Sequence, residues 1–584
     1  MTDTVGVSSA LSHGFARLRG SSSLGWSAAA VLISLAVALP LAAIALFALR
    51  SSGDTWTHLV NTVLPSSALT TVLLMTGVGV LTLVIGTSTA WLVTMYRFPG
   101  RQVMEWLLLL PLAMPTYIIA FCYMELFDYS GLAQTALRAA FGWSSAAEYW
   151  FPDIRTLAGA IVLLSFVLYP YVYLTARASF LQQSVCVLEV SRTLGCNRWG
   201  CFRQVALPLA RPALVAGVTL ALMECLNDIG AVEFLGVKTL TVSVYDTWLN
   251  RGSLSGAAQI ACVMLVFVFA LLFAERAARG RRHFHHTTGK YRHLPEEDLG
   301  RTGGVLALLA CLVPVIVGFV MPAGVLASAS VRYFDAALAE GFWRNAANSL
   351  TLSAAAAFIA VVLGVVLAYA CRITRSKLVH GMAGIAATGY AVPGTVLAVG
   401  ILVPLAGFDN AVDAFMRERF GISTGLLLSG TAAAIVMAYT VRFLAVSLGA
   451  FDSGLMMVSR CLDAASRALG VGVSQSLLRV HLPILRPALG AAALLVFVDS
   501  MKELPATLLL RPFDFNTLAT HIYELASLDR FEESALSALT IVAIGLAPVI
   551  LIHKTIVSGR PGTASIRKEP LPELSYSRSG HTRP

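Results

Sequence analysis

The sequence predicts an all-α, polytopic membrane protein with about twelve transmembrane helices in two parallel six-helix repeats. Three observations lead to this prediction. Of the 584 residues, 57% are hydrophobic and only 13% are charged, a composition typical of membrane proteins rather than soluble enzymes. Apolar runs long enough to cross a bilayer recur along the chain. Two polar stretches also repeat each other at a constant separation.

The first half of the chain is predicted to span residues 27–274, with a core of about 60–274, after a polar cytoplasmic segment at residues 1–26. Its first apolar run is too long for the core of a signal peptide, so we interpret that run as a spanning helix. The six apolar runs of this half lie near residues 27–49, 67–95, 104–127, 157–176, 212–232 and 254–274.

A hydrophilic linker at residues 275–303 follows and contains His283, His285 and His286, a candidate metal site. No second ligand group with a defined spacing accompanies these histidines, so we interpret the segment as a solvated basic linker beside the membrane and predict no metal. The sequence leaves the role of the linker histidines, up to His293, open.

The second half is predicted to span residues 304–553, with a core of about 345–553, and a polar cytoplasmic tail at residues 554–584 follows it. The six apolar runs lie near residues 304–328, 348–371, 379–405, 424–449, 488–510 and 534–553.

The distribution of charge predicts the orientation. If both termini, the linker and both repeated stretches are cytoplasmic, basic residues dominate the inside and acidic residues dominate the outside, as the positive-inside rule requires. The net charge of +10 then reflects topology and contact with anionic membrane lipid, not nucleic acid. The nine cysteines include no C-x-x-C pair, which argues against a zinc or redox site.

The repeated polar stretches each predict a helix, a bend at a glycine and a second helix that a Leu-Pro pair interrupts. The first copy has its acid six positions before the glycine, whereas Ala464 takes that slot in the second copy and the acid comes one position earlier. The residues concerned are Glu189, Gly195, Leu207 and Pro208 in the first copy, and Asp463, Gly470, Leu482 and Pro483 in the second.

Other pairs of segments extend the repeat. Pro115 and Pro393 stand at matching places and are predicted to break their helices. The remaining matched pairs are Asn61-Thr62 with Asn348-Ser349, Thr239-Leu240 with Thr517-Leu518, and the segment around Glu224, Asn227 and Asp228 with that around Asp499, Lys502 and Glu503.

Charged residues within or beside the predicted spans suggest a gate or a solute path. Such charges are expensive in a bilayer and mark function by default. Their spacing of three and four places each set on one helix face, where Lys502 can pair with Asp499. The alternative is a set of packing ion pairs or residues at the outer membrane surface. The candidate residues are Glu224, Asp228, Asp499, Lys502 and Glu503.

The sequence contains no catalytic constellation. It has no G-x-x-x-x-G-K-[ST], no G-x-S-x-G and no H-E-x-x-H motif, so we predict neither an enzyme nor a bound cofactor. A solute carried uphill would draw its energy from a partner or from an ion gradient.

The duplicated Glu…Gly…Leu-Pro pattern resembles the EAA loop of permease subunits of bacterial ABC importers, the binding-protein-dependent transport inner membrane component family. The stretch from Asp499 to Pro512 is similar to the ferric-iron (Fe³⁺) branch. The resemblance implies a type I ABC importer permease fold, loops that contact a cytoplasmic ATPase dimer, a periplasmic solute-binding protein and a place in the bacterial inner membrane. One residue is about 100° of helix, so Asp463 is expected to point away from the ATPase.

Two alternatives remain open. The same mechanism serves thiamine, phosphonate or polyamine uptake in fused permeases of similar build. A secondary transporter driven by an ion gradient also has two parallel halves, but it has no need of the paired Gly…Leu-Pro loops. The cargo is not named by any residue of the sequence.

Overall fold

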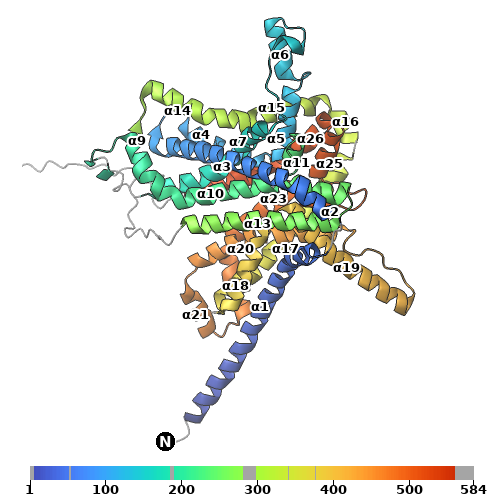
Figure 1. Cartoon of the computed structure of the whole chain (residues 1–584). Coiled ribbons are helices and arrows are strands. Elements are labelled where there is room, and N and C mark those ends of the chain that lie inside the picture. The colour runs from blue at the N-terminus through green and yellow to red at the C-terminus, as the bar shows by residue number, and fades with distance from the viewer. Residues whose placement is uncertain are drawn as a thin grey trace, which may run out of the picture.

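The computed structural model describes residues 5–50, 54–183, 190, 191, 193–279, 297–339, 341–374 and 376–558 (Figure 1). This part of the chain contains eleven helices that are long and apolar enough to cross a membrane. The number becomes twelve if the bent pair Arg101–Ala113 and Thr116–Phe141 is one span. The predicted all-α fold with about twelve spans is confirmed.

The first series of elements runs to residue 279, and η marks 3₁₀ and π turns. In order these are α1 (Val5–Ala48), α2 (Asp54–His58), η1 (Leu59–Val63), α3 (Leu64–Met95), β1 (Tyr96–Arg97), α4 (Arg101–Leu107), η2 (Leu110–Ala113), α5 (Thr116–Phe127), α6 (Leu132–Phe141), η3 (Ala146–Glu148), α7 (Leu157–Gln182), α9 (Arg198–Gly200), η4 (Cys201–Ala206), α10 (Leu207–Asn227), α11 (Gly230–Phe234), α12 (Leu240–Tyr245), η5 (Asp246–Asn250) and α13 (Leu254–Arg279).

The second series begins with a two-residue strand that pairs in parallel with β1. In order its elements are β2 (Glu297–Asp298), α14 (Gly300–Val315), η6 (Ile316–Val320), α15 (Met321–Arg332), α16 (Phe334–Ala339), α17 (Phe342–Ile373), α18 (Lys377–Ala386), η7 (Ala387–Ala391), α19 (Gly394–Phe420), α20 (Ala432–Met457), α21 (Arg460–Ala468), α22 (Val473–Ser476), η8 (Leu477–His481), α23 (Leu482–Met501), α24 (Pro505–Leu510), α25 (Leu518–Ser527), η9 (Phe531–Ser534) and α26 (Ala535–Ser558).

The two series of helices interlock. Helix α1 packs on α17, α18 and α19, which belong to the second series, while α14 and α15 pack on α3, α4, α5 and α26. The approach of α1 to α19 is close, because a Cβ built on Gly400 would lie 2.4 Å from the carbonyl oxygen of Pro40. The first helix of each series therefore packs on helices of the other series, which the sequence did not predict.

Both predicted helix breaks are present. The backbone leaves helical geometry at Pro115, with ψ of 142°, and at Pro393, with ψ of 144°. The first break bends the chain by 92°. Proline lacks an amide donor and restricts the residue before it, so a helix ends before each proline and a new one begins after it.

The predicted span near 424–449 starts later than expected, at Ala432. The preceding loop is tied to α19, because the backbone N–H of Thr424 donates to Asp413 over 2.8 Å and that of Ser429 donates to Asp409 over 2.8 Å. Thr431 then caps α20. The apolar residues before Thr431 lengthen the hydrophobic run in the sequence, but they are not helical.

The repeat is anchored by matching hydroxyl groups. Thr71 accepts a hydrogen bond from the Leu240 amide over 3.0 Å, and Ser349 accepts one from the Leu518 amide over 2.7 Å. The structural counterpart of Ser349 is therefore Thr71, and the sequence pairing with Thr62 was wrong. The register depends on a contact between distant segments, which a local Asn-polar pattern does not reveal.

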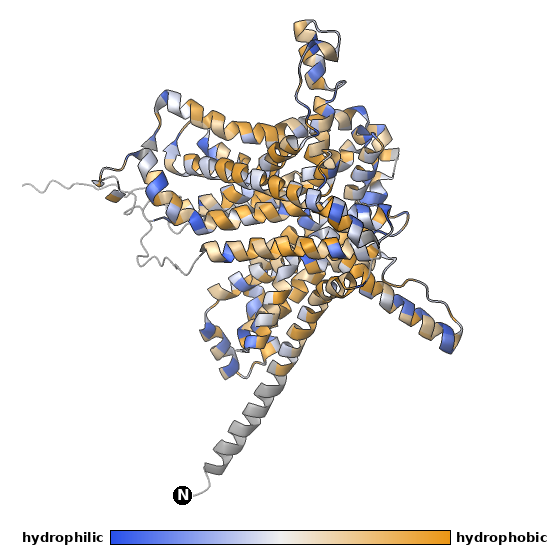
Figure 2. Ribbon diagram, viewed as in Figure 1, coloured by the Kyte–Doolittle hydropathy of each residue, from blue (hydrophilic) through white to orange (hydrophobic). Residues whose placement is uncertain are grey.

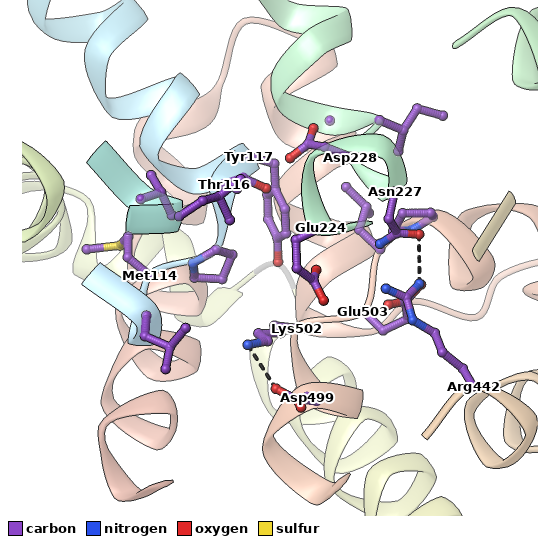
Figure 3. Close-up of a pocket in the computed structure, with 18 of the residues that line it drawn as sticks. Met114, Thr116, Tyr117, Glu224, Asn227, Asp228, Arg442, Asp499, Lys502 and Glu503 are labelled. Atoms are coloured by element: carbon purple, nitrogen blue, oxygen red, sulfur yellow. Dashed lines mark hydrogen bonds and ion pairs between the residues drawn. The ribbon is translucent and has the colours of Figure 1, made fainter. Parts of the chain in front are cut away.

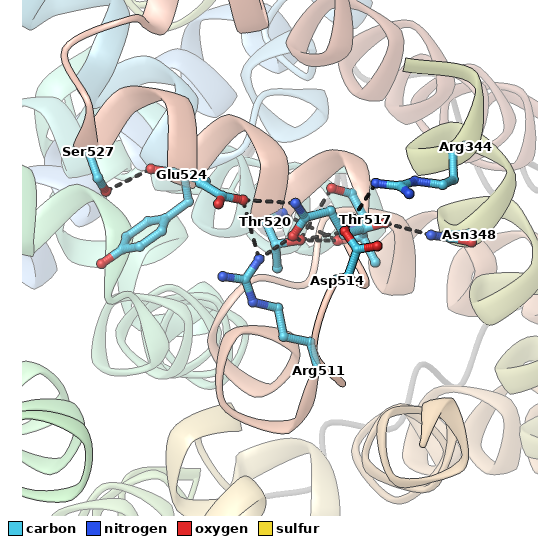
Figure 4. Close-up of polar contacts among 10 residues, drawn as sticks. Arg344, Asn348, Arg511, Asp514, Thr517, Thr520, Glu524 and Ser527 are labelled. Atoms are coloured by element: carbon cyan, nitrogen blue, oxygen red, sulfur yellow. Dashed lines mark hydrogen bonds and ion pairs between the residues drawn. The ribbon is translucent and has the colours of Figure 1, made fainter. Parts of the chain in front are cut away.

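A polar network holds the start of α25 against α17 (Figure 4). Asn348 donates to the carbonyl oxygen of Asn516 over 2.9 Å, and the Asn516 amide donates to Glu524 over 2.8 Å. Arg344 and Asp514 form an exposed ion pair at 3.4 Å. These bonds fix the loop between α24 and α25.

The surface pattern fits a bilayer. Hydrophobic residues cover the long helices, while hydrophilic residues gather at their ends, around α9 and α21 and on α6 and the far end of α19 (Figure 2). Helix α1 begins at Val5 and so includes most of the polar N-terminal segment predicted at residues 1–26. The linker histidines and the tail beyond Ser558 lie outside the described residues.

Candidate coupling loops and polar cavity

The two predicted bends are built alike. Gly195 has φ of +89° and Gly470 has φ of +76°. Past each glycine, a backbone N–H reaches back five residues, from Cys196 to Ser191 over 3.0 Å and from Val471 to Ser466 over 2.9 Å, the pattern of a Schellman cap. Open space surrounds the Cβ position of both glycines, so glycine is needed for its left-handed angle rather than for lack of room.

The Leu-Pro pairs do not end their helices, which corrects the sequence prediction. A π turn, η4 or η8, precedes each pair, and the N–H of Leu207 and Leu482 bonds to a carbonyl five residues earlier. The prolines then stand in the first turn of α10 and α23, where a missing donor costs little. Each helix continues through a wider turn into its transmembrane part.

Of the acids in the two loops, the structure describes only the one in the second loop, because Glu189 lies outside the described residues. Asp463 accepts from Arg372 Nη2 over 2.8 Å and from Nε over 3.0 Å, and lies 2.7 Å from His481 Nε2. Arg372 also donates to the carbonyl oxygen of Val458 over 3.0 Å. Asp463 thus contacts other parts of this chain and fastens α21 to the end of α17.

The predicted gate residues gather around one cavity at the far ends of α10 and α23, about 30 Å from the Leu-Pro pairs (Figure 3). The cavity measures about 80 Å³, room for a few water molecules. Thr116 and Tyr117 at the start of α5 face it from the opposite side. All five predicted residues line it: Glu224, Asp228, Asp499, Lys502 and Glu503.

A buried arginine that the sequence analysis did not single out joins the two series of helices. Arg442 on α20 is 4% exposed, and its Nη1 donates to Asn227 over 2.8 Å and to Glu503 over 2.9 Å. The Asn227 oxygen also accepts from the Gly394 amide over 2.7 Å. Asn227 at the end of α10 is therefore held by both α19 and α20.

Three further contacts order the acids. Tyr390 donates to Glu224 over 2.9 Å, again across the two series. Asp228 accepts from the Ala231 amide over 2.8 Å at the start of α11. The predicted pairing of Lys502 with Asp499 is present at 2.9 Å.

The second acid of the repeated pair behaves like the first. Glu503 accepts from the Ala506 amide over 3.3 Å at the start of α24, as Asp228 does at the start of α11. Both acids are more than nine-tenths buried. The repeat thus uses equivalent carboxylates to begin two equivalent short helices after the spans end.

Two buried polar atoms beside the cavity have no protein partner in the described chain, Nε of Arg442 and the hydroxyl of Tyr117. Buried groups of this kind are normally satisfied by water or a ligand. The cavity is therefore polar and able to hold water.

The sequence does contain a signal for Arg442. Arg442 is the one basic residue in the apolar helix α20, and an intramembrane charge of this kind marks a functional or structural partner. Asn227 is identified from the sequence only as part of the repeated segment around Glu224 and Asp228. Tyr390 gives no signal, because neutral polar side chains are common near span ends and its partner lies far away in the chain.

Comparison with known proteins agrees with this architecture. Residues 82–282 match the family described as binding-protein-dependent transport system inner membrane component. The sulfate transport system permease protein CysT of Escherichia coli (strain K12) is 32% identical over 206 residues, which are 34% of this chain and 70% of that protein. The chain belongs to the binding-protein-dependent transport system inner membrane component family.

Other relatives differ in how much of the chain they match. The Fe(3+)-transport system permease protein FbpB 2 of Haemophilus influenzae is 25% identical over 493 residues, 83% of this chain and 88% of that protein. The molybdenum transport system permease protein ModB of Escherichia coli (strain K12) is 26% identical over 197 residues, 32% of this chain and 82% of that protein. Family membership and the spans make the protein a multi-pass inner-membrane transport subunit, not an enzyme.

The Arg442–Glu503 pair is expected to matter for stability. Replacing Arg442 by Met would leave Glu503 buried without its cation and cost about 3–5 kcal/mol, whereas the double variant Arg442→Met/Glu503→Gln should recover part of the loss. Thermal unfolding of the purified protein in detergent measures both. Arg417→Met, which removes an exposed side chain paired with the partly buried Asp413, serves as a control that should cost under about 1 kcal/mol. Equal shifts at Arg442 and Arg417 would contradict the structural role of the buried pair.

Proposed function

We propose that this protein is the fused permease subunit of an ATP-driven ABC importer that takes up ferric iron delivered by a periplasmic binding protein. The observation that carries the proposal is the match along most of both chains to the Fe(3+)-transport permease of Haemophilus influenzae. A ferric transport system permease protein FbpB of Actinobacillus pleuropneumoniae, 22% identical over 77% of this chain and 65% of that protein, adds support.

The proposed division of the chain follows the repeat. One permease half would span residues 27–274 and the other 304–553, joined by the linker at 275–303. Both Schellman bends would face a cytoplasmic ATPase dimer, with the N- and C-termini on the same side. Figure 1 supports this, because α9 and α21 lie at the same end of the long helices, away from α11 and α25.

The two bends would contact the ATPase with different chemistry. In the second loop, Asp463 is engaged with Arg372 and His481, so its carboxylate would shape the loop rather than bind the partner. In the first loop the proposed contact is Glu189, together with Gly195 and the Leu207-Pro208 pair. In the second loop Gly470 and the Leu482-Pro483 pair would take that role.

The polar cavity would be the closed gate of the solute path. Four carboxylates face two basic side chains there, an excess of negative charge that suits a cation with a preference for oxygen ligands. Arg442 and Tyr390 tie the second half to Asn227 and Glu224 of the first, so opening a path between the halves would require these bonds to break.

The cavity would be a gate and not a storage site. In the described part of the chain, no group of three or more His, Cys, Asp or Glu side chains is placed to hold a metal ion. Selectivity for ferric iron would then rest mainly with the binding protein, and the permease would pass the ion without holding it tightly.

Uptake into proteoliposomes tests the proposal. The permease is reconstituted with the ATPase and binding protein encoded beside its gene, and ⁵⁵Fe(III) uptake is measured together with ATP hydrolysis. Iron uptake that requires ATP is expected. Uptake of ³⁵S-sulfate in place of iron, suggested by the sulfate relative, would reject ferric iron as the cargo.

The gate is tested by the double variant Asp228→Asn/Glu503→Gln. We expect uptake to fall at least about tenfold, a loss of about 1.4 kcal/mol in barrier lowering, while the binding protein still docks. Glu148→Gln on the exposed outer loop is the matched control and should transport normally. Unchanged uptake with coupled hydrolysis in the double variant would mean that these acids only stabilise packing.

The coupling role of the second bend is tested with two neighbouring glycines. Gly470→Val should abolish transport while the protein still inserts, because a β-branched residue with φ of +76° is strained. Gly472 has φ of −66° and equally open surroundings, so Gly472→Val should keep transport. Normal transport by Gly470→Val would remove the second bend from the coupling mechanism.

The proposed orientation is tested by thiol labelling. A cysteine introduced at Ser145 should react with an impermeant reagent on intact spheroplasts, whereas one at Thr287 in the linker should react only after permeabilisation. The unsubstituted protein reports labelling of its native cysteines, of which Cys461 is exposed. The reverse pattern would invert the topology.

A further inference from the structure

A long groove runs along the membrane-spanning surface of the first series of helices, beside the first coupling loop. Its volume is about 920 Å³, near the upper end of the range of about 300–1,000 Å³ typical of ligand sites. Helices α3, α10 and α13, all long and apolar enough to span a membrane, form its walls. Representative wall residues are Leu83, Val84, Leu214, Val218, Leu222 and Leu271.

The groove has one polar end. Trp199 of α9 and Arg211 near the start of α10 border it there, and both side chains are exposed. Glu275 borders the same end but already has an interaction partner. Arg211 makes no hydrogen bond or ion pair with other described residues, so its charge is available to an anion.

We propose that this groove binds a phospholipid with an anionic headgroup. The acyl chains would lie along the apolar walls, and the headgroup phosphate would bind the Arg211 guanidinium. Trp199 has the amphipathic ring that favours the membrane interface. Basic pockets between transmembrane helices at the cytoplasmic surface attract anionic lipids.

A lipid fits this groove better than a protein helix or a polar solute. The walls come from three candidate spans, from most of α10 and from the C-terminal halves of α3 and α13, and they are mainly apolar. The polar end is confined to the side of the coupling loop, which matches the division of a phospholipid into tails and head.

The site belongs to the first half only. Arg211 has a counterpart in Arg486, but Ser474 stands at the place of Trp199 and Ala493 at the place of Val218. The aromatic end and the full apolar wall are thus not repeated. Arg486 therefore offers a matched basic residue outside the proposed site.

A lipid bound in the groove would affect the first coupling loop. The groove is lined by Trp199 and Phe202, whose rings lie 5.3 Å apart, and by the Leu207-Pro208 pair. A lipid seated there would restrain the segment between the bend and α10. This consequence rests on the proposed coupling function, whereas lipid binding itself does not.

Native mass spectrometry of the purified full-length protein tests the inference, with added phosphatidylglycerol or phosphatidylcholine. The unsubstituted protein should bind phosphatidylglycerol more tightly than phosphatidylcholine. Arg211→Gln should weaken phosphatidylglycerol binding about fivefold, the effect of one basic contact. Arg486→Gln should bind as the unsubstituted protein does, and Val215→Trp, which fills the groove, should exclude both lipids.

The outcomes are distinct from those of the uptake assay. Equal loss in Arg211→Gln and Arg486→Gln, or no preference for phosphatidylglycerol, would overturn the inference. Inorganic phosphate that displaces the lipid at millimolar concentration would also overturn it, because a free anion site needs no acyl groove. A dependence of ATP hydrolysis on the lipid would show in addition that the lipid affects coupling, and this last step alone rests on the proposed permease function.

Discussion

The burial of one guanidinium organises the centre of this protein. Arg442 stands in an apolar helix, where an unpaired charge would be very expensive, so acceptors must converge on it. Glu503 supplies the countercharge from its own half, and Asn227 supplies an amide oxygen from the other. The same Asn227 oxygen binds the Gly394 amide at the start of α19. One buried cation thereby fixes where α10, α19 and α24 meet, and so the shape of the cavity between the halves.

The repeat supplies the symmetry and a few residues break it. Equivalent prolines bend two helices, equivalent acids begin α11 and α24, and equivalent hydroxyls anchor α12 and α25. In the first half, Asn227 stands at the place of Lys502. The ion pair of Lys502 with Asp499 therefore lies in the second half, whereas the side-chain amide that bridges to α19 and α20 lies in the first half. The cavity is therefore pseudo-symmetric in backbone but asymmetric in charge.

The interlocked first helices have a mechanical consequence. Helix α1 packs on helices of the second series, α14 packs on α3 and α4 of the first, and α15 lies between α5 and α26, so the halves cannot separate without moving these helices. In the proposed coupling mechanism, movement at the two bends would be transmitted as rotation of packed units rather than as their dissociation. Asp463 contributes to this by tying the second bend to the end of α17 through Arg372, so that the bend and its half move together.

By itself the sequence determined the features that depend on neighbours in the chain. Apolar runs set the spans, Pro115 and Pro393 set the breaks, and Gly195 and Gly470 set the bends, because each is a local consequence of hydrophobicity or backbone freedom. The intramembrane acids were recognisable because charge is costly in a bilayer. Tertiary structure alone decided that α1 crosses to the other half, that Thr71 rather than Thr62 anchors the repeat, and that Arg442 reaches Asn227. These contacts join residues far apart in the chain, and the packing of whole helices, not local pattern, brings them within bonding distance.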